Sequence, residues 1–78
     1  MAMFKVEWHG CDEEYRPVVR EHGTFDTLEA AQNSVREWWK KNDFEPPYIR
    51  QWKQENVVVW DYGSHICFYH FVEEEQHG

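Results

Sequence analysis

Between residues 57 and 72, two short apolar runs flank the dipeptide Gly63-Ser64. Such a dipeptide is typical of a two-residue hairpin turn, because glycine readily adopts the positive φ that this turn needs. Counting outward from the turn pairs Trp60 with Cys67. We therefore expect a β-hairpin here, on which the rest of the chain packs.

The two faces of this predicted hairpin differ in kind, since successive residues of a strand point to opposite faces. One face, called here the aromatic face, comprises Trp60, Tyr62, His65, Cys67, Tyr69 and Phe71. The other, called the aliphatic face, comprises Val57, Val59, Ile66, Phe68 and Val72. Neither has the polar residues of a solvated face. One face should cover the core and the other should be covered or used, and a one-residue shift at the turn would exchange them.

Three further strands are expected before the hairpin. Residues 4–8 alternate apolar and polar positions, as a half-buried strand does. Residues 15–22 form a second candidate strand, and Pro17 predicts that it lies at a sheet edge, because proline cannot donate to a ladder. Residues 48–54 form a third candidate, and a tight turn after it would place Arg50 opposite Asp61.

A single helix is predicted from residue 27 to about residue 42. Asp26 suits the N-cap, and Glu29 three residues later completes a capping box. Apolar residues then recur at helical spacing on one stripe. The members of this stripe are Leu28, Ala31, Val35 and Trp39.

The element order is therefore β-β-α-β-β-β, which predicts an α+β fold with a single antiparallel sheet of four to five strands and one helix packed across one face. We expect the helix to cover the aliphatic face and to leave the aromatic face partly open. The 78 residues suffice for one small domain. The acidic C-terminal tail, residues 73–78, is expected to fray.

Charge and composition exclude several function classes. The formal net charge of −7 repels nucleic-acid backbones and anionic membranes, so we expect neither as a partner. No apolar run approaches membrane-spanning length. The N-terminal residues do not have the pattern of a secretory signal, and two cysteines in a reducing compartment would stay thiols, so a cytoplasmic location is expected.

Two His-x-Cys pairs are the most suggestive metal-binding feature. They are His9 with Cys11 and His65 with Cys67. If the first and last strands are neighbours, the pairs meet on the aromatic face and provide a tetrahedral set suited to zinc. The single-residue spacing is not that of common zinc modules. We predict no metal and no other cofactor, and leave open whether the four residues meet.

Catalysis has little support in the sequence. Cys67 beside His65 or His70 is a conceivable nucleophile and base, but no third group is identifiable to orient the base. Phosphate-binding loops and hydrolase motifs are absent from the sequence. We therefore predict that the protein is not an enzyme, and the sequence does not indicate a small-molecule ligand.

The remaining expectation is a small non-catalytic protein-binding module. Interfaces are enriched in aromatic residues, and 18% of this chain is aromatic. The predicted protein interface is Trp60, Tyr62, His65, Tyr69 and Phe71, and the expected partner is a second copy in a homodimer or another protein. A loop of the same chain folded over this face is the structural alternative. The functional alternative is an acidic inhibitor or regulator that docks on a basic partner, including a nucleic-acid mimic of the phage-accessory type.

Overall fold

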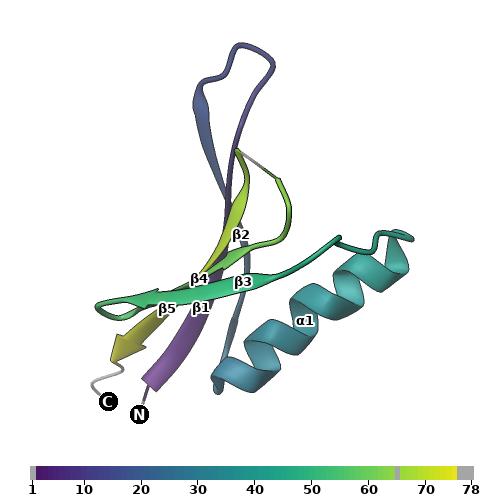
Figure 1. Ribbon diagram of the computed structural model, residues 1–78. Coiled ribbons are helices and arrows are strands. Elements are labelled where there is room, and N and C mark those ends of the chain that lie inside the picture. The colour runs from purple at the N-terminus through teal and green to yellow at the C-terminus, as the bar shows by residue number, and fades with distance from the viewer. Residues whose placement is uncertain (1, 65, 76–78) are drawn as a thin grey trace.

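The computed structural model describes residues 2–64 and 66–75 and confirms the α+β fold with one antiparallel sheet and one helix. The elements follow the predicted order: β1 (Ala2–Cys11), β2 (Pro17–Phe25), α1 (Leu28–Lys41), β3 (Arg50–Gln54), β4 (Val57–Asp61) and β5 (Phe68–Glu75). The sheet has the strand order β2-β1-β5-β4-β3. Figure 1 shows α1 on one side of the sheet, and the long β1–β2 hairpin extending beyond the other strands.

Strand β2 forms one edge of the sheet, as Pro17 predicts. Its pairing with β1 is irregular at one point. Val6 pairs with Gly23 and Glu7 pairs with Glu21, so His22 is an extra residue opposite this step. An extra residue of this kind is a β-bulge, which redirects a side chain and increases the local twist of the strand.

The helix begins one residue later than the capping pattern predicted. Thr27 is the N-cap, and its Oγ1 accepts a hydrogen bond of 3.0 Å from the Ala30 backbone N–H. The assignment of Asp26 as N-cap is therefore wrong, because a threonine in the next position makes the same bond. The apolar stripe is confirmed, with Ala31, Val35 and Trp39 buried.

The turn predicted at Gly63-Ser64 is wrong, since the structure forms a longer loop between β4 and β5. Trp60 pairs with Tyr69 and Asp61 pairs with Phe68, so the pairing has moved by two residues. An even shift leaves the residues of the two strands on their predicted faces. The face assignment is therefore confirmed within β4 and β5, whereas Tyr62, Ile66 and Cys67 lie in the loop.

Gly63 is still needed in this loop. Its φ is 96°, a left-handed value that glycine adopts without strain. A Cβ at this position would also overlap the ring of Pro47. The predicted pairing of Arg50 with Asp61 is confirmed in the β3–β4 ladder.

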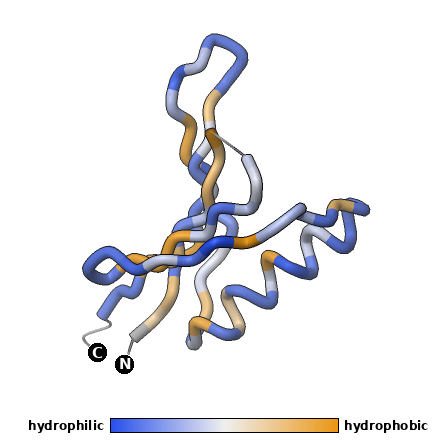
Figure 2. Tube along the Cα trace, viewed as in Figure 1, coloured by the Kyte–Doolittle hydropathy of each residue, from blue (hydrophilic) through white to orange (hydrophobic). Residues whose placement is uncertain are grey.

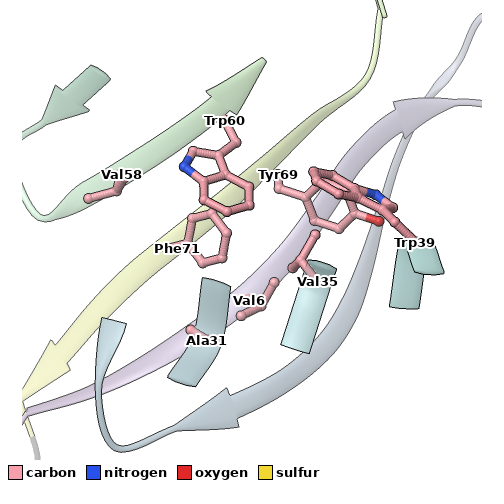
Figure 3. Packing of buried hydrophobic residues seen from close by; sticks show 8 residues of the cluster. All are labelled: Val6, Ala31, Val35, Trp39, Val58, Trp60, Tyr69 and Phe71. Atoms are coloured by element: carbon pink, nitrogen blue, oxygen red, sulfur yellow. The ribbon is translucent and has the colours of Figure 1, made fainter. Parts of the chain in front are cut away.

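The helix covers the aromatic face, not the aliphatic one, so the predicted choice of face is wrong. Trp60, Tyr69 and Phe71 are only 2%, 5% and 0% exposed. Figure 3 shows their rings beside Val6 of β1 and Val35 of α1. The Phe71 ring meets the Trp60 indole edge-on at 4.9 Å between centroids, which is a favourable aromatic geometry.

Two physical reasons explain this choice of face. Pairing of Val6 with Phe71 and of Trp8 with Tyr69 places the apolar side of β1 on the aromatic face. The charged side of β1 falls on the aliphatic face, where burial under a helix would be costly. The small residues of α1, Ala31 among them, also leave room that large sheet side chains fill at close-packed density.

The acidic residues 73–75 are part of the sheet, contrary to the expected fraying. They continue β5 and pair with the start of β1, with Ala2 opposite Glu75. The Glu73 backbone N–H also donates to the Asn56 carbonyl at 2.8 Å. The rest of the predicted tail, residues 76–78, lies outside the described residues.

Candidate functional site

The sheet face that points away from α1 is called the open face. It carries the odd-numbered residues of β1 and the residues that pair with them across the sheet. Its principal members are Lys5, Glu7, His9, Val19, Arg50, Trp52, Val57, Val59, Asp61, Phe68, His70, Val72 and Glu74. Figure 1 places α1, the one helix of the described residues, on the opposite side of the sheet.

An apolar patch lies on the open face over β3, β4 and β5, among the charged residues of those strands. The Trp52 indole meets the Phe68 ring edge-on at 6.2 Å and keeps 39% of its surface exposed. Val57 and Val72 pair beside them and are half-buried. Along the same strands Figure 2 shows hydrophobic and hydrophilic segments in alternation, with a hydrophilic tip on the β1–β2 hairpin.

Two histidines stack at the centre of the open face. The rings of His9 and His70 lie 3.8 Å apart between centroids, at an interplanar angle of 22°. Glu7 Oε1 lies 3.2 Å from His9 Nε2. Burial lowers the pKa of His70, and the neighbouring His9 lowers it further, while Glu7 acts in the opposite direction.

Both cationic side chains on the open face, Lys5 and Arg50, are in ion pairs. Lys5 Nζ lies 3.3 Å from a Glu74 carboxylate oxygen and 3.6 Å from Glu7. The hydrogen bond to Glu74 is the largest cause that raises the pKa of Lys5. Arg50 Nη2 donates to the buried Asp61 carboxylate at 3.1 Å, which confirms the predicted ion pair.

A separate cleft opens on the helix side of the sheet, beyond the C-terminal half of α1. It has a volume of about 380 Å³. Its lining is Trp8, Arg20, Glu21, His22, Trp38 and Tyr69. The residues come from four elements, and sequence reasoning missed the cleft because no local pattern joins them.

The predicted interface residues lie mostly inside the protein. Trp60, Tyr69 and Phe71 belong to the core and are covered by α1, so in this structure they do not form the open surface that the prediction assumed, although Tyr69 contributes to the floor of the cleft. His65 lies outside the described residues. What the prediction lacked was the register of β1 against β5, which decides how the charged residues are distributed.

Tyr62 is half-buried at the end of the core. Its hydroxyl accepts a 2.9 Å hydrogen bond from Trp8 Nε1. Burial raises the pKa of Tyr62 to about 12, although the bond from Trp8 acts in the opposite direction. The contact between Tyr62 and Trp8 joins the β4–β5 loop to the floor of the cleft.

The described members of the two His-x-Cys pairs do not share one face, and His65 lies outside the described residues. The strands β1 and β5 are neighbours as expected, but His9 pairs with Phe68, so His9 and Cys67 occupy opposite faces. No group of three or more potential ligands occurs among residues 2–64 and 66–75. Cys67 and His70, the conceivable nucleophile and base, also lie on opposite sides of the sheet. Cys67 directly precedes β5 and His70 is three residues further along it, and residues an odd number of positions apart in a strand point to opposite faces.

The acidic loop 12–14 is partly compensated by its own neighbours. The Asp12 carboxylate accepts hydrogen bonds of 2.9 Å from the backbone N–H groups of Glu14 and Arg16. Arg16 also donates to Asp12 through Nε and lies 3.6 Å from Glu14. The backbone bond from Arg16 is the main cause that lowers the pKa of Asp12.

Comparison of the chain with protein-family models, with curated proteins and with solved structures finds no match. The fold and the surfaces therefore define the protein as a small α+β domain with one covered sheet face and one open one. Within the part of the chain that the structure describes, α1 is too short and too polar to cross a membrane.

Proposed function

We propose that the protein is a non-catalytic binding module that associates with a second copy of itself through the open face. The observation that carries this proposal is the apolar patch on β3 and β5 of that face, where Trp52, Phe68 and Val72 remain partly exposed. Large exposed aromatic side chains on a sheet are typical of interaction surfaces. The proposal keeps the predicted self-association and moves it to the other side of the sheet.

The area that a dimer needs would use most of the open face. The molecule measures 40 × 27 × 20 Å, and the β1–β2 hairpin extends beyond the other strands. A stable interface needs about 800 Å² from each partner. Two such sheets can pack face to face at a spacing of about 10 Å.

Part of the charge on the open face is paired, although the chain has a net charge of −7. Lys5 lies between Glu7 and Glu74, and Arg50 pairs with Asp61. Two copies that meet through this face would bring these ion pairs together, with the excess carboxylates near the β1–β2 side of the face and the apolar contact on β3, β4 and β5. The acidic loop 12–14 gives weaker support to docking on a basic partner, because Arg16 neutralises part of its charge.

The sheet edges are less suited to self-association than the face. Edge strand β3 carries Arg50 and Lys53, and edge strand β2 begins with Pro17. Charged residues and proline at sheet edges oppose the pairing of strands between chains. A second copy is therefore expected to bind across the open face.

The oligomeric state tests this proposal. Light scattering coupled to size exclusion, at about 100 µM protein and physiological salt, is expected to give twice the 9.6 kDa mass of one chain. The double variant Trp52→Gln, Val19→Lys should elute as a folded monomer, because both side chains are exposed on the open face. Trp38→Gln is the matched control, as this exposed tryptophan lies on the helix side.

Two results would contradict the proposal. A monomeric wild type at this concentration would show that the open face does not bind a second copy. If Trp38→Gln is a monomer and the double variant remains a dimer, the contact between copies lies on the helix side. Circular dichroism of each variant verifies that a loss of mass is not a loss of fold.

A further inference from the structure

We propose that the cleft beside Trp38, with its lining residues Trp8, Arg20, His22 and Tyr69, is a binding site for a small, flat aromatic carboxylate. This cleft is separate from the open face and from the self-association proposed there. Its volume of about 380 Å³ falls in the lower part of the range for small-molecule sites. It is also more enclosed than the hollow beside the β1–β2 loop.

The floor of the cleft is a row of three paired positions across the sheet. Tyr69 pairs with Trp8, and Trp8 pairs with Arg20, so their side chains share the helix-facing side. The hydrogen bond from Trp8 Nε1 to the Tyr62 hydroxyl holds the indole in place. A ring fixed in this way gives the cleft a preorganised floor, which lowers the entropy lost on binding.

Gly10 makes the position of the Trp8 ring possible. A Cβ at Gly10 would overlap the six-membered ring of Trp8, so the indole lies directly against the backbone of this residue. Close approach of a ring to the main chain is one of the uses of glycine. Any larger residue at Gly10 would displace the floor of the cleft.

The walls are aromatic and come from α1 and from the β-bulge. The His22 ring lies 6.2 Å from Trp38 and 6.4 Å from Tyr69, edge-on to both. Because His22 is the extra residue of the bulge, the irregularity in β2 places this ring on the helix side. Trp38 is 48% exposed, so one face of its indole is accessible to a guest.

Arg20 supplies the preference for an anion. Its guanidinium carbon lies 5.8 Å from the centre of the Trp8 ring. Every ion pair found among the described residues leaves Arg20 out. Glu21 also lines the cleft, but it pairs with Glu7, so its side chain belongs to the open-face side of β2, and it contributes to raising the pKa of Lys5 there. A guest carboxylate can therefore form a charge-assisted hydrogen bond with Arg20 while its ring stacks on Trp38 and contacts the floor beside Trp8.

The test uses 2-naphthoate as the probe, with binding followed by NMR through the indole N–H signals of Trp8 and Trp38. Wild type is expected to bind it at submillimolar concentration, with these two signals shifting first. Arg20→Gln should weaken binding by roughly tenfold, because it removes a charged hydrogen-bond donor. The neutral 2-naphthamide should bind wild type and Arg20→Gln alike.

Arg36→Gln is the matched control for the arginine. The Arg36 guanidinium also lies over a tryptophan, at 5.2 Å from the Trp60 ring, but it is outside the cleft. The Arg36→Gln variant should bind 2-naphthoate with the affinity of wild type. Trp38→Leu, at an exposed position of α1, should weaken both the acid and the amide because it removes a stacking wall.

Three outcomes would overturn the proposal. The first is no shift of the Trp8 and Trp38 signals at millimolar probe. The second is equal weakening by Arg36→Gln and Arg20→Gln. The third is a shift centred on Trp52, which would assign the probe to the open face.

Discussion

Replacement of Phe71 by alanine is the most direct test of which sheet face forms the core. Phe71 is completely buried and packs edge-on against Trp60, beneath α1. Truncation of a buried phenylalanine to alanine costs about 3–5 kcal/mol. A chain of 78 residues has a total free energy of unfolding of about 4–12 kcal/mol. Phe71→Ala should therefore remove a large part of the stability.

Phe68→Ala is the matched comparison on the open face. Phe68 has the same side chain on the same strand, but it is only half-buried and contacts the exposed Trp52. Full burial of a phenylalanine stabilises by about 1.5–3 kcal/mol, so partial burial should contribute about 1 kcal/mol. The two variants should thus differ by at least 2 kcal/mol.

Urea unfolding followed by circular dichroism and tryptophan fluorescence measures this difference. With a denaturant slope of about 1 kcal/mol per molar urea, Phe71→Ala should lower the midpoint by about 3 M or more and Phe68→Ala by about 1 M. Measurements at two protein concentrations separate folding from association, because a dimer stabilises by mass action. A larger loss for Phe68→Ala than for Phe71→Ala would refute the assignment of the core.

Three further predictions concern the helix cap and two titrating groups. Thr27→Ala should destabilise by about 1 kcal/mol in urea, and Asp26→Ala by clearly less, because the Thr27 hydroxyl accepts the capping bond. The pKa of His70 is lower in the folded protein than in the unfolded chain, where it is near 6.5, so the folded state binds this proton more weakly. The free energy of unfolding should therefore fall as pH drops below about 7. The variant His70→Asn should show a weaker dependence on pH over this range. Tyr62, with its pKa raised to about 12, stays protonated after the unfolded chain ionises near pH 10, so stability should fall from pH 10 to 12, and less so in Tyr62→Phe.

The surface that we propose for binding was only partly predictable. The sequence separated the aromatic and aliphatic residues of the hairpin correctly, and it predicted the contact of Arg50 with Asp61. It did not predict the cleft, because Trp8, His22 and Trp38 are brought together by a bulge and a helix crossing. The stacking of His9 on His70 was missed for a similar reason, since it depends on the pairing of the first strand with the last.

The sequence by itself determined the local features of this protein. Alternation fixed which side chains of each strand share a face, and helical spacing fixed the stripe that contains Ala31 and Val35. These features depend on the spacing of apolar residues along the chain, which is a local property. They were therefore predicted correctly although the predicted β4–β5 pairing was shifted by two residues.

Only the tertiary structure decided which face of the sheet is covered. Which face is covered depends on the apolar and charged side chains that all five strands place on each face. Strand β1 adds Val6 to the aromatic face and Lys5 to the aliphatic one. Burial of the aliphatic face would have placed this charge and that of Asp61 beneath a helix, at a high desolvation cost. The hairpin alone contributes Asp61 to that cost, but Lys5 comes from β1, a strand that is distant in the sequence.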